Sequence, residues 1–196
     1  MERGGLQENG FDPRGLLAAL HRNYLNYVLI GGLARVIRGT DEVTGGVDIC
    51  PSLRLENVER LGRGLEELDA TRADRRRLVV DEESLRAERV LRLRTRFGEL
   101  NVVVEPAGTR RGFDDLRRGS TEEHIGAGLR PRVASVADLA RMSAALAHDL
   151  GEQPGREAER LRALEVGRSR ELRRIMEVEV GMERRLGISR GLGIDR

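Results

Sequence analysis

The sequence contains no lysine and is poor in cysteine and aromatic residues. All 35 basic residues are arginine, tryptophan is absent, and Cys50 is the only cysteine among 196 residues. A chain without lysine cannot form a Schiff base and cannot supply the lysine of a P-loop or of a protein kinase. A single cysteine excludes an intramolecular disulfide and a CxxC zinc site. The chemistry that remains uses carboxylates, arginines, backbone amides and hydroxyls, which favours a divalent metal and a phosphate-bearing substrate.

The charges are numerous but nearly balanced. Acidic residues number 33 against the 35 basic ones, so the formal net charge is only +2. This balance gives little support to nucleic-acid binding unless the arginines cluster. An arginine-only chain is better explained by a GC-rich genome than by selection for phosphate contacts. The arginine run at 75–77 is open to two interpretations, solvated surface or RNA contact.

No segment resembles a targeting or membrane-spanning sequence. Residues 1–10 are polar and glycine-rich, and no stretch approaches the ~18 apolar residues that suggest a transmembrane helix. We therefore expect a cytoplasmic protein that does not enter the membrane. Because the aromatic fraction is 3%, the core is expected to be aliphatic.

Local patterns predict a series of short helices and strands. Asp12 followed by Pro13 is typical of a helix start, and this helix should end near Asn23. The apolar run over 27–30 predicts a strand that stops at a glycine pair. The other predicted elements are a helix over 33–38, a polar loop over 39–46, a strand over 47–50, a helix over 54–68, a basic connector over 70–77, a strand over 90–96, a turn at 97–99, a strand over 100–105, a helix from Ser135 to about 150 with a Ser135/Asp138 capping box, and a helix over about 156–186.

This mixture of short strands, a hairpin and helices predicts an α+β or mixed α/β fold. The chain divides into a flexible N-terminus over 1–11, a core over 12–130, a C-terminal helical region over 131–186 and a mobile tail over 187–196.

The most informative residues lie between Tyr27 and Cys50. A strand that ends at Gly31 and Gly32 and then enters a helix can present backbone N–H groups to an anion, although a tight turn is the simpler interpretation. Asp48 lies between Val47 and Ile49 in the next strand. A carboxylate among apolar neighbours is costly to bury unless it is paired, for example with an arginine, or binds a metal.

Four segments together resemble a known family. They read YVLIGGLARVIRG, DEVTGGVDIC, FGELNVVVEP and GFDDLRRGSTEEHIGAGLRPRVASVADLARM. In this order they resemble the nucleotidyltransferase superfamily, and within it the AbiEii/MenT-type toxin nucleotidyltransferases. The resemblance covers roughly residues 12–165. It implies a nucleotidyltransferase-like core, with a short mixed sheet flanked by helices and a C-terminal helical region.

The resemblance also implies a site and a reaction. Gly31, Gly32 and Thr44 would bind the nucleotide, and Asp48 would be the catalytic carboxylate that binds Mg²⁺. Asn101 and Glu99 would be weaker metal ligands. The implied substrate is an NTP, the implied acceptor a nucleic-acid 3′ end such as that of tRNA, and the implied partner a cognate antitoxin.

Several positions depart from the family pattern. The first metal carboxylate of the family falls on Gly46, the later acid falls on Asn101, and a late lysine falls on Ser143. The basic residue expected before Thr44 is Glu42. The metal site is therefore expected to be degenerate, with Asp41, Glu42 or Glu99 as candidates for the missing carboxylate.

Three hypotheses follow. The first is a Mg²⁺-dependent nucleotidyltransferase, because Asp48 and the glycine turn are kept. The second is a catalytically degenerate member that binds a nucleotide, an RNA or a protein, because Gly46, Asn101 and Ser143 replace expected residues. The third is a small interaction protein in which the family signal misleads.

Overall fold

A computed structural model describes the chain over residues 10–149. Residues 1–9 of the expected flexible N-terminus over 1–11, the helix expected over about 156–186 and the tail expected over 187–196 lie outside these described residues. Along the chain the elements are α1 (Pro13–Arg22), β1 (Tyr27–Ile30), α2 (Gly31–Ile37), β2 (Gly46–Pro51), α3 (Leu55–Glu67), β3 (Thr71–Arg72), α4 (Glu82–Glu88), β4 (Val90–Thr95), β5 (Gly98–Val103), α5 (Phe113–Gly119), β6 (Thr121–Glu122), β7 (Arg132–Val133) and α6 (Val136–Asp149).

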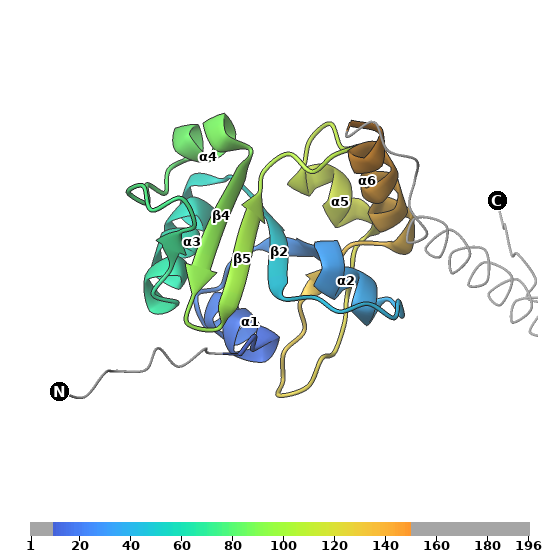
Figure 1. Cartoon of the computed structure of the whole chain (residues 1–196), viewed down its shortest axis with the longest axis horizontal. Helices are drawn as coiled ribbons and strands as arrows, with labels where there is room; N and C mark the ends of the chain where they lie inside the picture. Colours follow the sequence, from blue (N-terminus) through green and yellow to red (C-terminus); the bar gives the residue numbers. More distant parts are fainter. Residues whose placement is uncertain (1–9, 150–196) are drawn as a thin grey trace, which may run out of the picture.

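The strands form one mixed sheet in the order β3-β4-β5-β2-β1-β7-β6. β2 pairs with β5 and β1 with β7 in parallel, whereas the other neighbours are antiparallel. This arrangement confirms the predicted mixed α/β fold. β2 and β1 lie near the centre of the sheet, so residues on these two strands have paired backbone on both sides (Figure 1).

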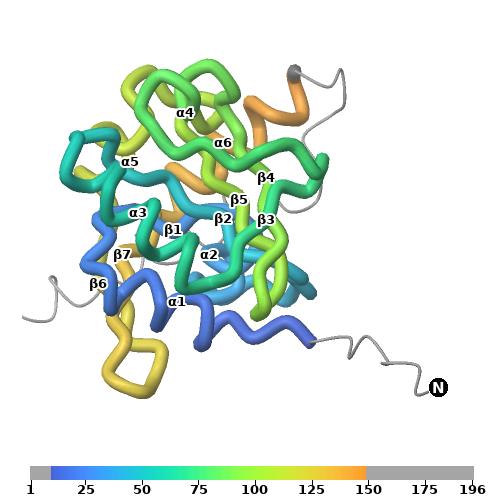
Figure 2. The backbone as a smooth tube through the Cα atoms, turned by 90° about the vertical axis from the view of Figure 1, so that its left-hand side faces the viewer, coloured from blue at the N-terminus to red at the C-terminus, as the bar shows by residue number. Residues whose placement is uncertain are grey.

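The β4–β5 hairpin separates an apolar face from a polar face. Leu91, Leu93, Leu100 and Val102 point into the buried core, while the residues that alternate with them are exposed or half-buried. The core side is covered by α1 and α3, which lie behind the hairpin in Figure 1 and to its left in Figure 2. The polar face of β4, β5 and β2 is the face that α2 adjoins.

Helix starts follow the expected capping chemistry. The Asp12 carboxylate accepts hydrogen bonds from the backbone N–H groups of Arg14 and Gly15, both at 3.0 Å, and α1 ends at the predicted Asn23 cap. At α6 the Asp138 N–H donates to Ser135 Oγ at 3.0 Å, and Ser135 Oγ–H donates to the Asp138 carboxylate at 2.7 Å. Both predicted caps are confirmed.

Some predicted boundaries were wrong. The helix expected from residue 33 begins at Gly31, and the turn expected at 97–99 ends earlier, because Gly98 and Glu99 already pair with β4. The connector expected over 70–77 contains the strand β3, while α4, β6 and β7 were not predicted. The three missed strands have two residues each and depend on pairing with distant segments. Among the described residues, no helix is long and apolar enough to cross a membrane.

Candidate functional site

The turn from β1 into α2 brings Gly31 against Asp48. Ile30, the last residue of β1, pairs with Asp48 across the antiparallel β1–β2 ladder. Gly31 has a φ of +68°, and a Cβ added there would lie 1.8 Å from Asp48 Oδ2. A side chain at position 31 is therefore excluded twice, by the left-handed backbone and by the carboxylate. Glycine at position 31 therefore allows the half-buried Asp48 carboxylate to pack directly against the turn.

Gly32 makes a similar close approach to Thr44. A Cβ at position 32 would lie 2.9 Å from Thr44 Oγ1 and 3.1 Å from Thr44 Cβ. The Thr44 hydroxyl donates a hydrogen bond to the Gly46 carbonyl at 3.0 Å, which fixes the loop that enters β2. The four residues that the resemblance selects, Gly31, Gly32, Thr44 and Asp48, thus converge at one place although they span two elements and a loop.

Asn101 is the direct neighbour of Asp48 on the parallel strand β5. Its Nδ2–H donates a hydrogen bond to Asp48 Oδ1 at 2.7 Å. A charged acceptor makes this hydrogen bond stronger than one between neutral groups. In this arrangement the amide stabilises the carboxylate as a donor, whereas a second acid at position 101 would repel it.

The other candidate carboxylates are placed differently. Glu99 pairs with Gly46, two residues before Asp48 on β2, so Glu99 lies on the same face of the sheet as Asp48 and diagonally across from it. Glu99 is exposed. Glu42 is held by Arg35 through two hydrogen bonds of 2.8 Å, and its side chain is only 13% exposed. Asp41 is exposed in the loop. Of the three, Glu99 is the one whose strand position directs it toward the Asp48 face.

Three arginines near the site were missed by the sequence analysis. Arg35 has a guanidinium nitrogen 3.8 Å from the position that a Gly32 Cβ would take. Arg92 pairs with Asn101, and Arg94 pairs with Glu99, so both lie in the same rows across the sheet as Asp48 and Gly46. Both are exposed, and the described residues give neither an ion-pair partner. Their alternation along β4 predicted a solvated face, but the pairing of that face with Asp48 depends on a register that the sequence does not reveal.

The residues present do not form a cluster of metal-binding carboxylates. Within residues 10–149 no group of three or more His, Cys, Asp or Glu side chains could hold a metal ion. Asp48 has an amide beside it and glycine at position 46, so this donor set does not fit a two-metal centre, which needs several carboxylates. Ser143, at the position of the family's late lysine, lies half-buried on α6, and α6 packs against α2.

Cys50 follows Asp48 on β2 but is not available for chemistry. It is fully buried, and burial, aided by the charge of Asp114, raises the pKa of its thiol to about 12. The thiolate is the reactive and metal-binding form, so the buried, protonated thiol of Cys50 is inert in the folded protein. His21 and His124, which share no ligand spacing, are both exposed.

No protein-family model and no curated protein matches the chain. One solved structure that resembles it is a Thermotoga maritima protein described as a proposed nucleotidyltransferase. The two are 15% identical, with a TM-score of 0.47, over 88% of this chain and 99% of that one.

Proposed function

We propose that the chain is a nucleotidyltransferase-type protein that binds an NTP at the β1–α2 turn and has a degenerate metal site. The observation that carries the proposal is the convergence of Gly31, Gly32, Thr44 and Asp48, which the sequence resemblance selects and which lie in contact across separate segments. An arrangement of this kind is expected for a phosphate-binding turn beside a metal-binding strand.

The triphosphate is proposed to lie on the polar face that carries Asp48. The Gly31–Gly32 turn would supply backbone N–H groups, and the Thr44 hydroxyl would donate to phosphate in place of its bond to the Gly46 carbonyl. Arg92 and Arg94 are two cations without carboxylate partners among the described residues, one strand beyond Asn101 and Glu99. Arginine forks match phosphate oxygens, and they would supply positive charge where the family uses a lysine.

Mg²⁺ is proposed to bind more weakly here than in a complete site. Asp48 would be the only carboxylate in the central row, Asn101 would offer a neutral amide oxygen after a flip of its side chain, and Glu99 would approach from the diagonal position. When bound, the ion would neutralise phosphate charge and orient the donor. The chain's own residues bind and orient the triphosphate.

Two functions are compatible with this site. Transfer of a nucleotidyl group to a nucleic-acid 3′ end such as that of tRNA, with a cognate antitoxin as partner, follows the toxin-type resemblance and is favoured by Glu99 on the Asp48 face. Binding of a nucleotide, an RNA or a protein without transfer is favoured by the Asn101–Asp48 hydrogen bond, which occupies a carboxylate oxygen that the metal would need.

The test begins with binding of labelled NTPs, measured with Mg²⁺ and with EDTA. We expect wild type to bind, and Asp48→Ala to reduce binding in Mg²⁺ by at least about tenfold, equivalent to ~1.4 kcal/mol. Asp41→Ala is the matched control, because Asp41 is an exposed aspartate in the neighbouring loop. If neither Mg²⁺ nor EDTA conditions give NTP binding, the proposal is wrong.

Label transfer to a tRNA pool then separates the two functions. Turnover by wild type supports transfer. No turnover by wild type, with turnover gained in Gly46→Asp/Asn101→Asp, supports a degenerate transferase that now only binds. The side chain added at position 46 must fit beside Glu99, because a Cβ there would lie 3.1 Å from Glu99 Cβ, so the folded state of the variant is checked by circular dichroism.

A further inference from the structure

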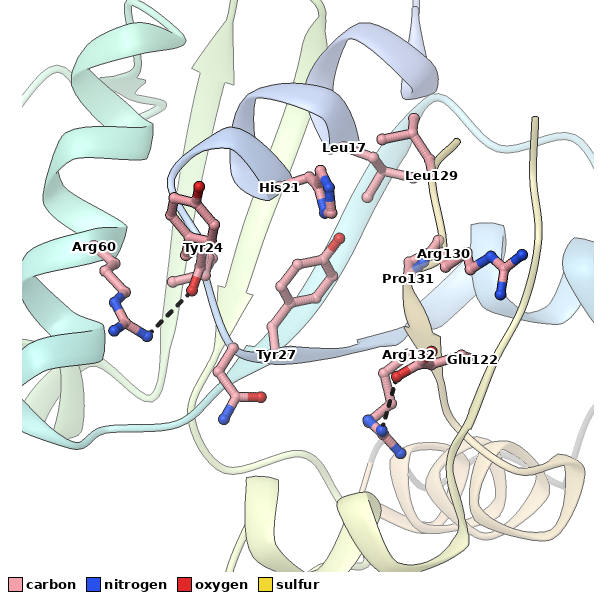
Figure 3. A pocket seen from close by; sticks show the side chains of 12 residues that line it. Leu17, His21, Tyr24, Tyr27, Arg60, Glu122, Leu129, Arg130, Pro131 and Arg132 are labelled. Atoms are coloured by element: carbon pink, nitrogen blue, oxygen red, sulfur yellow. Dashed lines mark hydrogen bonds and ion pairs between the residues drawn. The ribbon is translucent and has the colours of Figure 1, made fainter. Parts of the chain in front are cut away.

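A polar pocket lies away from Asp48, at the opposite end of β1. Tyr27 begins β1 and pairs with Pro51, whereas Ile30 ends it and pairs with Asp48. The pocket has a volume of about 410 Å³ and is formed by the C-terminal end of α1, the start of β1, one residue of α3 and the segment around β7 (Figure 3). Its lining residues are Leu17, His21, Tyr24, Leu25, Asn26, Tyr27, Arg60, Glu122, Leu129, Arg130, Pro131 and Arg132.

Both tyrosines of the chain line this pocket. The sequence has only two tyrosines and no tryptophan, so the gathering of its largest aromatic rings here stands out. Tyr24 is 80% exposed, whereas Tyr27 is buried, and burial raises the pKa of its hydroxyl. Tyr27 therefore stays neutral, as a hydrogen-bonding group at the base of the pocket. Figure 3 shows Tyr24 and Arg60 on one side of the pocket, with Arg130 and Arg132 on the other.

Tyr24 occupies a backbone position that favours glycine. It has a φ of +54° and follows the Asn23 cap of α1. Its N–H donates to the His21 carbonyl at 2.9 Å, and the next N–H, from Leu25, donates to the Leu20 carbonyl at 3.1 Å. These two bonds define a Schellman motif, in which the left-handed residue is usually glycine. Tyr24 is one of five described non-glycine residues with a positive φ, and it is the only aromatic residue among them.

The pocket carries an excess of positive charge beside the exposed ring. Arg60 donates to the Tyr24 carbonyl at 3.4 Å, and Arg132 forms an ion pair with Glu122 at 3.1 Å. Arg130 is exposed, and the described residues give it no ion-pair partner. Three arginines against one glutamate leave a site that attracts an anion. An aromatic face and arginine guanidinium groups around one cavity match a ligand that is planar at one end and anionic at the other.

We propose that this pocket binds a nucleotide unit, with its base stacked on Tyr24 beside Arg60 and its phosphate held by Arg130 on the other side of the pocket. Stacking on an exposed aromatic ring, with arginines along the phosphates, is how proteins hold nucleotides of single strands without reading their sequence. The unit is either a free mononucleotide or one nucleotide of a single-stranded nucleic acid. The proposal does not depend on the function of the Asp48 site, because it uses other residues.

The first experiment uses NMR with tyrosine-labelled protein. Only two tyrosines contribute signals, so a base stacked on Tyr24 should shift that ring's protons upfield and shift those of Tyr27 less. The probes are uridine 5′-monophosphate, ribose 5-phosphate and a uridine tetranucleotide. We expect uridine 5′-monophosphate to bind more tightly than ribose 5-phosphate, and tighter binding of the tetranucleotide to identify a single strand as the source. Equal affinity for ribose 5-phosphate would show a simple anion site and overturn the proposal.

The second experiment separates binding from stability. Tyr24→Gly removes the ring and relieves the left-handed strain, so we expect an equal or higher melting temperature together with a 5- to 150-fold loss of affinity, about the range for loss of one base–aromatic stack. Tyr24→Phe should bind like wild type. Arg130→Gln should weaken binding, while Arg63→Gln, an exposed arginine of α3 outside the pocket lining, should not.

Two further results would contradict the proposal. If Tyr24→Gly lowers the melting temperature and leaves the affinity unchanged, Tyr24 is structural. If Asp48→Ala abolishes the Tyr24 shift, the nucleotide binds only at the first site. If the nucleotide still shifts the Tyr24 signal in Asp48→Ala, the nucleotide binds at a site separate from Asp48, whatever the outcome of the NTP experiments.

Discussion

The residue beside Asp48 determines whether its carboxylate meets a hydrogen-bond donor or a second negative charge. An amide donor at 2.7 Å satisfies Asp48 Oδ1 without a metal. An acid at position 101 would instead require a cation between the two groups, because two carboxylates at this distance repel. At the residue scale, therefore, the Asn101 amide gives Asp48 Oδ1 a hydrogen-bond donor where a second acid would give it a like charge.

The stability of an Asn101→Asp variant should depend on pH and on metal. In Asn101→Asp, repulsion should raise the upper pKa of the carboxylate pair above its value in the unfolded chain. Stability should then be greatest at low pH and fall as pH rises through that pKa, with a loss on the order of 1–2 kcal/mol at neutral pH from the missing charged hydrogen bond. Added Mn²⁺ or Mg²⁺ should recover stability at neutral pH. Urea unfolding from pH 4 to 8, with and without metal, measures this.

The matched control is Asn101→Leu, which also removes the donor but adds no charge. It should lose stability to a similar extent without responding to metal. If the aspartate and leucine variants show the same pH profile and neither responds to metal, the two carboxylates are not close enough to interact, and the interpretation of the site is wrong.

Cys50 gives a second prediction at the residue scale. Burial raises its thiol pKa to about 12 from an ordinary value of 9.0. The folded state therefore holds the proton over a range in which the unfolded chain has lost it, so this thiol's contribution to stability is complete below pH 9 and is lost between about pH 9 and 12. Cys50→Ala should show a shallower stability decline over that range. Thiol labelling of native protein at pH 8 should be limited by unfolding, and rapid labelling would contradict the burial.

At the scale of elements, the β1–α2 turn determines where the site lies. Gly31 combines a positive φ with contact to Asp48, whereas Gly32 contacts Thr44. Both glycines are therefore needed for packing around functional candidates, and not only for a tight turn.

Substitution of these glycines should separate the cost of left-handed backbone strain from the cost of the steric clash. Gly31→Ala should destabilise the fold by at least about 2 kcal/mol, since it adds left-handed strain to a steric clash. Asp48→Gly in the same chain should recover only the part due to the clash. Gly32→Ala should cost less and be relieved by Thr44→Gly, whose removed Cβ and Oγ1 are the contacting atoms. Double-mutant cycles from chemical denaturation give both coupling energies; zero coupling in both pairs would refute the packing described here.

The elements that the sequence predicted are those with local signals. The Asp12 and Ser135 caps, the 27–30 strand and the β4–β5 alternation each depend on neighbours within a few residues. β3, β6 and β7 have two residues each and exist only through long-range pairing. For α4 a local signal was present but not used, because Asp81 accepts a hydrogen bond from the Ser84 N–H at 2.7 Å as an N-cap.

The same distinction applies to the site. Gly31, Gly32, Thr44 and Asp48 were found because they lie within one window of sequence. The positions of Arg92 and Arg94 beside them depend on the parallel register of β2 with β5, which no local pattern specifies. The pocket around Tyr24 likewise joins residues from α1, α3 and the β7 region.

At the scale of the whole described molecule, Arg38 ties α2 to the β7 edge of the sheet. Its side chain is only 4% exposed. It donates to the carbonyls of Ala134 at 2.9 Å and Val133 at 2.7 Å, and it also bonds Thr121 and pairs with Glu123. α2, the helix that follows the glycine turn, is thereby anchored to the strands β6 and β7 at the edge of the sheet. The β1–α2 turn is then held on one side by β1 and on the other by the anchored helix.

Loss of this anchor should loosen one edge of the sheet before the rest. Arg38→Met keeps the length of the side chain but removes every donor, so two buried carbonyls lose a partner and Glu123 loses a counter-charge. We expect a destabilisation of about 2–4 kcal/mol. Amide exchange should accelerate first at Ala134, whose N–H donates to Leu29 across the β1–β7 pair, while the β4–β5 hairpin stays protected. Arg132→Met is the matched control at the same edge, because Arg132 is far more exposed than Arg38 and its ion pair with the exposed Glu122 should contribute at most about 1 kcal/mol. If the two variants are equally stable, or if exchange accelerates uniformly across the sheet, Arg38 is not the anchor. If exchange accelerates only at the β7 edge, we also expect Arg38→Met to bind NTP more weakly, because α2 and the β1–α2 turn would be displaced. That result would link Arg38 to the geometry at Asp48.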